Sequence, residues 1–152
     1  MIEIVNKNIC LADTKYIAHQ CNCVSYGAAG LAKELFSRFP YSNIYANRKT
    51  EDHIPGDILI RGRRSREERL IINMLAQLYP GPPKYNNDSA EMREKYFLLC
   101  LEKIKNINDL QSIGFPFGIG CGLAGGNWDN YYSALNDFSK ELDGVKVVLY
   151  RL

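Results

Sequence analysis

The sequence predicts an α/β fold: a three-layer α/β/α sandwich around a mixed, mostly parallel sheet. Short apolar stretches with strand character alternate along the chain with segments whose apolar residues recur at helical spacing. In addition, two glycine-rich loops each follow an apolar stretch and lead into a helical pattern. Helices interleaved with buried strands cover both faces of a sheet, and such sheets are mostly parallel.

The N-terminal third of the chain alternates strand and helix patterns. Residues 2–5 and 16–22 have the apolar pattern of two strands. Residues 30–39 are predicted to form a helix, because Leu31, Leu35 and Phe39 fall on one face. Pro40 favours the first turn of another helix, which we expect to reach about residue 48.

The middle of the chain predicts a pair of strands and a longer helix. Residues 57–61 and 70–75 indicate two buried strands, joined by a charged turn that we expect to be a solvated hairpin tip. A loop rich in Pro, Gly and Asn follows over residues 79–88. Asp88 and Glu91 have the spacing of a capping pair, which predicts a helix from there to about residue 105.

The last third predicts strand, helix and strand. Residues 114–117 indicate a short strand, and residues 145–150 a closing one. Between them, Asn127 is expected to cap a helix with one apolar stripe. The stripe consists of Trp128, Tyr131, Tyr132, Leu135, Phe138 and Leu142.

Length and composition narrow the class of protein. The 152 residues are enough for one domain over 1–152 with a core of its own. A net charge of +2, from 19 basic and 17 acidic residues, gives no general case for a nucleic-acid binder. We expect no membrane span, no signal peptide and a monomer. Five scattered cysteines, an odd number, fit reduced thiols and a cytoplasmic location.

The two glycine-rich loops are the strongest functional signal. The first includes Gly27 and Gly30, and the second includes Gly118, Gly120 and Gly122. A strand that turns through glycines into a helix exposes backbone N–H groups, and the helix N-terminus adds a partial positive charge. Two such loops predict a binder of a nucleotide that contains a pyrophosphate.

Other motifs are weaker. Residues 120–125 match G-x-G-x-x-G, but no acidic residue ending a further strand follows, as a dinucleotide-binding domain requires. The Gly-Lys-Ser/Thr core of a P-loop is missing, and no arginine stands six residues after any cysteine, as in a thiol phosphatase. The spacing of Cys21 and Cys23 is too tight for a zinc site, and the two histidines are far apart. We therefore expect no metal and no cofactor.

Three segments together resemble the macrodomain family. They are the run from Gln20 to Ala32, the run from Ile119 to Trp128, and residues 148–152. The resemblance covers nearly the whole chain, and the branches most similar are the yeast ADP-ribose-1″-monophosphatase and the terminal ADP-ribose protein glycohydrolase. It implies a macrodomain-like α/β/α fold and ADP-ribose as the ligand.

The resemblance also implies which residues contact the ligand. Residues 27–31 would surround the distal ribose and its phosphate, and residues 119–124 would form the opposite phosphate loop. Asn8 would accept the adenine amino group through its amide oxygen, and Asn22 would reach the distal ribose. The full set is Asn8, Ile9, Asn22, Gly27, Ala28, Ala29, Gly30, Leu31, Ile119, Gly120, Cys121, Gly122, Leu123, Ala124 and Tyr150.

Departures from the family pattern bear on activity. The glycohydrolase branch relies on a lysine after the strand at 70–75 and on an acid after the second loop. Here residues 73–77 contain no lysine, and the acid position is Ala124. His19 matches the histidine of the phosphatase motif, and a histidine in such a buried strand can also be a satisfied core residue. Cys121 is expected to be a small inert residue, since no base or cation is adjacent in sequence.

These observations predict an enzyme that hydrolyses the terminal phosphate of ADP-ribose-1″-phosphate, or a related substituent of the distal ribose. His19 would act as general base or general acid, with a titration near neutral pH. Two alternatives stay open. One is a reader of ADP-ribose without catalysis, and the other is an ADP-ribosyl hydrolase acting on modified protein or nucleic acid.

Overall fold

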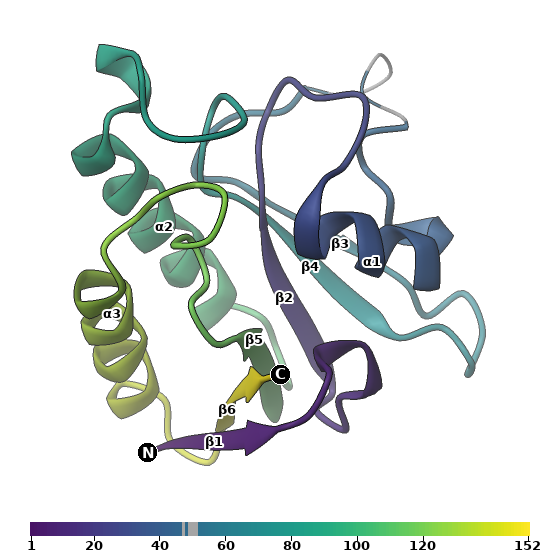
Figure 1. The fold of residues 1–152 in the computed structure, drawn as a ribbon. Coiled ribbons are helices and arrows are strands. Elements are labelled where there is room, and N and C mark those ends of the chain that lie inside the picture. The colour runs from purple at the N-terminus through teal and green to yellow at the C-terminus, as the bar shows by residue number, and fades with distance from the viewer. Residues whose placement is uncertain (47, 49–51) are drawn as a thin grey trace.

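A computed structural model describes residues 1–46, 48 and 52–152, and its centre is a six-stranded sheet (Figure 1). The strand order is β1-β6-β5-β2-β4-β3. Every neighbouring pair is parallel except β3 and β4, which form an antiparallel hairpin. The strands are β1 (Ile2–Asn6), β2 (Tyr16–Cys21), β3 (Ile58–Arg61), β4 (Leu70–Leu75), β5 (Ser112–Pro116) and β6 (Lys146–Arg151). The expected mixed, mostly parallel sheet is confirmed.

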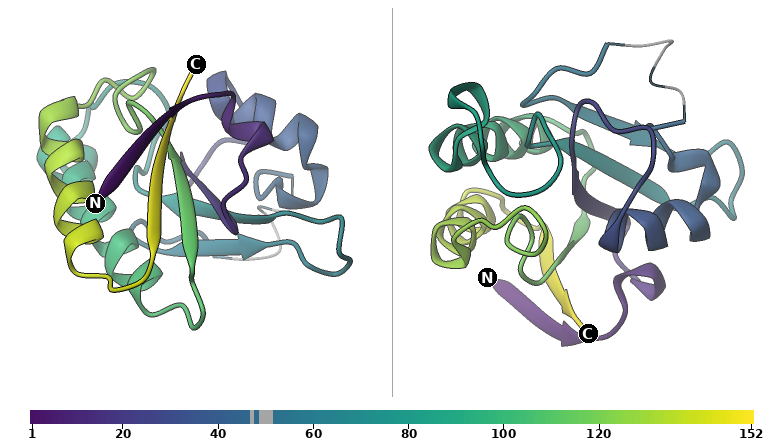
Figure 2. Two further views of the ribbon diagram at one scale, coloured as in Figure 1. Left: turned by 90° about the horizontal axis from the view of Figure 1, so that it is seen from below. Right: turned by 45° about the horizontal axis from the view of Figure 1, so that its top comes forward.

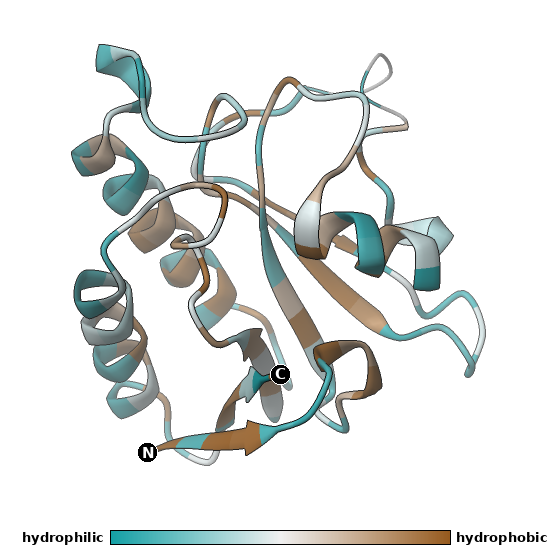
Figure 3. Cartoon of the chain, viewed as in Figure 1, coloured by the Kyte–Doolittle hydropathy of each residue, from teal (hydrophilic) through white to brown (hydrophobic). Residues whose placement is uncertain are grey.

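Helices cover both faces of the sheet, as the three-layer prediction requires. Helix α1 (Gly30–Arg38) packs on one face, and α2 (Ala90–Lys105) and α3 (Trp128–Lys140) pack side by side on the other (Figures 1 and 2). Phe97 of α2 and Leu135 of α3 lie in one buried cluster with Ile72 and Leu149 of the sheet. On the opposite face, Leu35 of α1 is buried in a second cluster. Strand β4, which lies between β2 and β3, is hydrophobic along most of its length, because both of its faces are covered (Figure 3).

The parallel strands β2, β4 and β5 end at the same edge of the sheet. Residues of β2 and β4 pair in register from Tyr16 with Leu70 to Cys21 with Leu75, and β5 pairs with β2 from its other side. The loops that follow these three strands therefore meet above one edge, where open α/β sheets bind their ligands.

The second helix begins one residue later than the capping pair predicted. Ser89 is its N-cap and accepts a hydrogen bond from the Met92 N–H at 3.1 Å. Asp88 is fully buried and accepts hydrogen bonds from the backbone N–H groups of Leu78 and Tyr79. Asp88 therefore holds the preceding loop and is not the cap. The predicted cap Asn127 is confirmed at the start of α3.

The helix expected from Pro40 to about residue 48 was wrong. Residues Pro40–Ser42 form a single 3₁₀ turn, and residues 44–46 form a turn. The side chain of Asn43 accepts hydrogen bonds from the N–H groups of Tyr45 and Ala46, an alternative to helical bonding that asparagine often offers. Asn47 and residues 49–51 lie outside the described residues.

The remaining predicted elements are confirmed, with ends that shift by one or two residues. Within the part of the chain that is described, none of the helices combines the length and apolar character needed to span a bilayer.

Candidate ligand-binding site

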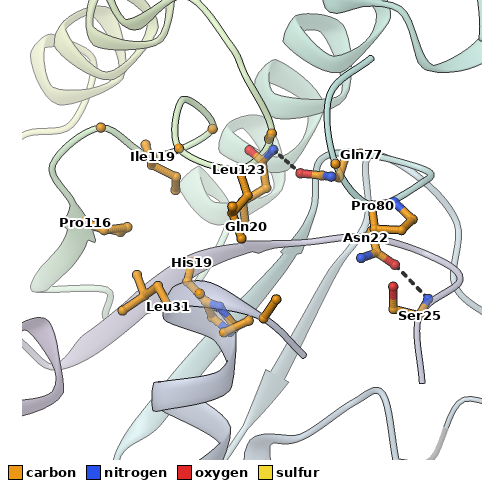
Figure 4. A pocket seen from close by; sticks show the side chains of 18 of the residues that line it. His19, Gln20, Asn22, Ser25, Leu31, Gln77, Pro80, Pro116, Ile119 and Leu123 are labelled. Carbon is orange, nitrogen blue, oxygen red and sulfur yellow. Dashed lines mark hydrogen bonds between the residues drawn. The ribbon is translucent and has the colours of Figure 1, made fainter. Parts of the chain in front are cut away.

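A pocket of about 570 Å³ opens at the edge of the sheet where β2, β4 and β5 end (Figure 4). This volume is in the range of sites for small molecules and cofactors. Its floor includes His19 and Gln20 of β2. We call residues 22–32 the first wall and residues 117–124 the second wall. A rim from Gln77 to Pro82 follows β4.

The first wall begins with a turn built by Asn22. Its side-chain oxygen accepts hydrogen bonds from the N–H groups of Val24 at 3.0 Å and Ser25 at 2.8 Å. Arg48 supports the turn from outside, since its guanidinium donates to the carbonyl oxygens of Asn22 and Ser25. It also stacks over Tyr45, with 4.6 Å from Cζ to the ring centroid.

The first wall ends at the N-terminus of α1, which has no side-chain cap. The N-cap residue is Ala29, whereas α2 and α3 are capped by Ser89 and Asn127. Gly30, Leu31 and Ala32 line the pocket. An uncapped helix N-terminus leaves backbone N–H groups and a partial positive charge for an anion.

The second wall is a tight glycine turn. Gly120 has a positive φ of 79°, and a Cβ there would lie 2.5 Å from the Tyr131 ring, so only glycine fits. Gly122 differs, because a Cβ there would meet nothing within 4 Å. In the described structure no backbone carbonyl accepts from the N–H groups of residues 120 and 122–124. These groups can serve an anion in the pocket.

A buried ion pair holds the second wall against the rim. Arg93 of α2 is 2% exposed and donates to the carboxylate of Asp88 at 2.6 Å. The same guanidinium donates to the carbonyl oxygens of Gly81 in the rim, at 2.7 Å, and Ala124 in the second wall, at 3.1 Å. One side chain therefore fixes the spacing of two loops around the pocket.

The two walls also approach each other. A Cβ on Gly30 would lie 3.1 Å from the Leu123 side chain, so the start of α1 nearly touches the second wall. Gly30 has a φ of +57°, which glycine adopts without strain.

His19 lines the pocket but is almost fully buried, with 1% of its surface exposed. Its Nε2 lies 2.6 Å from the Asn73 side-chain oxygen, and Phe36 packs edge-on against the ring. The Asn73 nitrogen donates to two carbonyl oxygens, so its oxygen faces His19 and Nε2 must be the protonated nitrogen. Burial lowers the pKa of His19 from 6.5 to about 4, and the bond to Asn73 offsets this in part. The imidazole is thus neutral at pH 7.

The thiols near the pocket are poor nucleophiles. All five cysteines are free. Burial raises the pKa of Cys121 to about 11 and raises that of Cys21 further. Cys21 lies within 3.8 Å of both ring nitrogens of His19, but a neutral buried imidazole does not favour a thiolate. Among the described residues no group of histidine, cysteine or carboxylate side chains could hold a metal ion.

Most of the residues expected at the site line this pocket. They are His19, Asn22, Gly27, Ala29, Gly30, Leu31, Ile119, Gly120, Gly122, Leu123 and Ala124. Five others lie outside its lining: Asn8, Ile9, Ala28, Cys121 and Tyr150. The Asn8 side chain caps a 3₁₀ turn, η1 (Ile9–Leu11), by accepting from the Cys10 N–H at 3.0 Å. Ile9 and Tyr150 are buried in the cluster that Leu31 also contacts.

The pocket lining also contains residues that were not among the ligand contacts expected from the sequence, although Gly118 belongs to the second glycine-rich loop. They are Gln20, Ser25, Ala32, Tyr45, Gln77, Pro80, Gly81, Pro82, Pro116, Phe117 and Gly118. Many of them directly follow β4 or β5. The Pro-Gly-Pro run after a buried parallel strand could have indicated the rim, because ligand sites lie beyond the carboxyl ends of such strands.

Comparison of the sequence with known proteins finds a phage relative but no family. No protein-family model matches the chain. It is 27% identical over 146 residues to an uncharacterized 17.5 kDa protein in the tk-vs intergenic region of Enterobacteria phage T4, covering 90% of this chain and 87% of that one.

Solved structures match over nearly the full chain. The macrodomain of Mycobacterium tuberculosis DarG is 20% identical, with a TM-score of 0.80, and the match covers 99% of this chain and 97% of that one. Thermosipho africanus DarTG, solved in complex with ADP-ribose, is 17% identical with a TM-score of 0.77, covering 99% of this chain and 41% of that one. An Oceanobacillus iheyensis macrodomain mutant with ADPR is 22% identical, with a TM-score of 0.67, and the match covers 98% of this chain and 84% of that one.

Proposed function

We propose that this chain, which has the macrodomain fold, binds ADP-ribose in the pocket between its two glycine-rich walls. The proposal rests on one observation above others. The uncapped N-terminus of α1 and the unpaired N–H groups of the second wall, both described above, line a single pocket. Backbone N–H groups from two sides suit the two phosphates of a pyrophosphate.

The pocket lining supports recognition by the backbone alone. Among the described residues that line it, none is lysine or arginine, and its histidine is neutral at pH 7. The neighbours solved with ADP-ribose have the same fold, which supports this ligand over other pyrophosphates.

Following the family resemblance, we place the adenine end of the ligand towards Asn8, Ile9 and Tyr150. These residues lie outside the pocket lining, but Ile9 and Tyr150 pack in one cluster with Leu31 of the lining. The Asn8 side-chain oxygen already accepts from the Cys10 N–H, but an amide oxygen has a second lone pair. It can therefore accept from the adenine amino group as well. In this placement Asn22, at the other end of the pocket, reaches the distal ribose.

Isothermal titration calorimetry with ADP-ribose and AMP tests the binding proposal. We expect a micromolar Kd or tighter for ADP-ribose, roughly −8 kcal/mol. AMP, which lacks the distal phosphate and ribose, should bind much more weakly. Equal affinities for the two ligands would contradict the two-wall site.

We further propose that the bound nucleotide can be ADP-ribose-1″-phosphate, and that the chain hydrolyses its terminal phosphate. The observation that favours this is His19 in the pocket lining. Its Nε2–H donates to the Asn73 side-chain oxygen, so Nδ1 carries no proton. A water molecule would attack phosphorus and give its proton to Nδ1. The bond from phosphorus to the 1″ oxygen would break, and that oxygen would take a proton from solvent.

The low pKa of His19 restricts this role to that of a base. A group with a pKa of about 4 is unprotonated at pH 7, so it cannot act as the general acid. The sequence analysis expected the rate to titrate near neutral pH through His19. With this pKa the titration should instead occur at acid pH. The rate should rise from about pH 4 and then level off.

Phosphate release from ADP-ribose-1″-phosphate by wild type and His19→Ala tests this role. Loss of a general base should slow release about a hundredfold while the Kd for ADP-ribose changes little. Full turnover by His19→Ala would contradict the assignment of His19 as the general base. A parallel incubation with ADP-ribosylated protein separates the alternatives: release of ADP-ribose would indicate an ADP-ribosyl hydrolase, and no product from either substrate would indicate a reader.

A further inference from the structure

Two glutamine side chains lie together in the pocket, from neighbouring strands. Gln20 comes from the end of β2, and Gln77 follows β4. The Gln20 Nε2 donates to the Gln77 Oε1 at 2.7 Å, as Figure 4 shows. Neither residue belongs to the glycine-rich walls.

The orientation of both amides is fixed by a backbone carbonyl. The Gln77 Nε2 donates to the carbonyl oxygen of Tyr79 at 2.8 Å. A carbonyl oxygen can only accept, so Gln77 must turn its nitrogen to Tyr79 and its oxygen to Gln20. Gln20 must then present its nitrogen to Gln77. This leaves the Gln20 oxygen, Oε1, as the free end of the chain of hydrogen bonds.

The Gln20 oxygen has no hydrogen-bond partner. It is one of four buried side-chain polar atoms without a partner among the described residues, and the other three belong to Arg69, Arg93 and Ser139. Of the four residues, Gln20 alone lines the pocket. A buried acceptor left unpaired destabilises the folded state, and such atoms in native proteins call for an explanation.

We propose that the Gln20 oxygen accepts a hydrogen bond from a hydroxyl of the terminal ribose of the ligand, so that Gln20 makes the pocket specific for a nucleotide that carries this second sugar. The inference rests on the proposed binding of ADP-ribose. Phosphate oxygens and adenine ring nitrogens are acceptors, so they cannot pair with this oxygen.

The position of Gln20 selects the terminal ribose among the hydroxyl-bearing parts. Gln20 is the last residue but one of β2, Asn22 directly follows the strand, and both side chains belong to the pocket lining. Asn22 is the residue assigned to the distal ribose. The adenine amino group, which is also a donor, is assigned to the opposite end, beside Asn8.

Calorimetry with ADP-ribose and ADP tests the inference, because ADP lacks the terminal ribose. The variants are Gln20→Met, which keeps the length but removes the acceptor, and Gln77→Met as the matched control. Gln20→Met should weaken ADP-ribose binding about five- to tenfold, the effect of one hydrogen bond, and leave ADP binding unchanged. Gln77→Met retains the Gln20 oxygen. It should therefore change the ratio of the Kd values for ADP and ADP-ribose less than Gln20→Met does.

Urea unfolding of the free variants supplies a second readout. Gln20→Met removes the unpaired oxygen but leaves the Gln77 Oε1 without its donor, so one amide atom stays unpaired. Gln77→Met leaves both the oxygen and the nitrogen of Gln20 unpaired. Gln20→Met should therefore have the higher urea midpoint of the two variants. The reverse order would contradict the unpaired state of the oxygen.

The outcomes separate this inference from the function it rests on. If wild type binds ADP and ADP-ribose equally, the proposed recognition of ADP-ribose fails, and the inference with it. If wild type prefers ADP-ribose and Gln20→Met keeps the same preference, only the role of Gln20 is overturned. Equal losses for both ligands in Gln20→Met would indicate a structural role and would also overturn it.

Discussion

The two walls of the pocket are each held by an arginine that donates to backbone carbonyl oxygens, but the two arginines have different surroundings. Arg93, behind the second wall, is 2% exposed and paired with the fully buried Asp88. Arg48, behind the first wall, is only partly buried and stacks on Tyr45. None of its described partners is a carboxylate.

This difference separates stability from binding. A buried charge that loses its partner is costly, so the second wall is tied to the folded state as a whole. A half-exposed arginine that loses its contacts returns to water, and only the local loop is affected. We therefore expect loss of Arg93 to cost much more stability than loss of Arg48, whose removal should mainly weaken ligand binding.

The largest effect is expected from Arg93→Ala. It strands the Asp88 carboxylate in the interior and frees Gly81 and Ala124, so the free energy of unfolding should fall by about 3–5 kcal/mol. Urea denaturation measures it. The control is Lys95→Ala on the same helix, which breaks an exposed pair with Glu91 and should cost about 0.5 kcal/mol or less. A similar loss in both variants would show that burial of the pair is unimportant.

The next effect concerns His19, which packs against Phe36 behind the first wall. Its pKa of about 4 in the folded state is below the ordinary value of 6.5, so the unfolded chain binds the proton first as pH falls. The free energy of unfolding therefore does not depend on His19 protonation above about pH 6.5. It decreases from there towards pH 4, by up to about 3 kcal/mol. Unfolding of wild type and His19→Gln across this range measures it. If His19→Gln loses stability as steeply as wild type, another group is responsible.

A change on the pocket side of the second wall should act on binding alone. In Gly122→Glu the side chain enters open space but brings a carboxylate to the phosphate path. The Kd for ADP-ribose should rise at least about a hundredfold, or 2.7 kcal/mol, with unfolding nearly unchanged. Gly122→Ala is the control and should bind normally. Normal affinity in a folded Gly122→Glu would exclude this wall as a phosphate contact.

The smallest effect is expected from Arg48→Ala, behind the first wall. Loss of the bonds to the carbonyl oxygens of Asn22 and Ser25 should raise the Kd for ADP-ribose about fivefold and cost about 1 kcal/mol of stability. Lys33→Ala, an exposed charge on α1, is the control and should change neither. If Lys33→Ala has the same effect, net charge and not loop position explains both.

Much of the fold could be predicted because its signals are local. Strand β4 is apolar apart from Asn73, and the helix after Asn127 has a regular apolar stripe, so both could be predicted from the sequence. The helix expected after Pro40 failed because a single side chain, Asn43, captures the next two N–H groups. Asp88 was mistaken for a cap because sequence spacing does not show that it is buried against Arg93.

Site residues could be predicted from the sequence where backbone conformation determines the residue type. They could not be predicted where contacts between distant parts of the chain determine the site. Gly120 and Gly122 were identified by their pattern, and both line the pocket. Gln20 and Gln77 are 57 residues apart and meet only because β2 and β4 are neighbours in the sheet. The environment of His19 likewise depends on Asn73, which pairs with it across the same two strands.

The place of β6 in the sheet has a consequence for how the protein is made. Strand β6 follows the other five in the chain but lies between β1 and β5, and among the strands that the structure describes it is the only one paired with β1. Of these six strands, β1 is synthesised before the others, and within the described sheet it has no partner until Lys146–Arg151 has emerged. A nascent chain stopped before that point should therefore carry residues 2–6 as an unpaired, protease-sensitive segment.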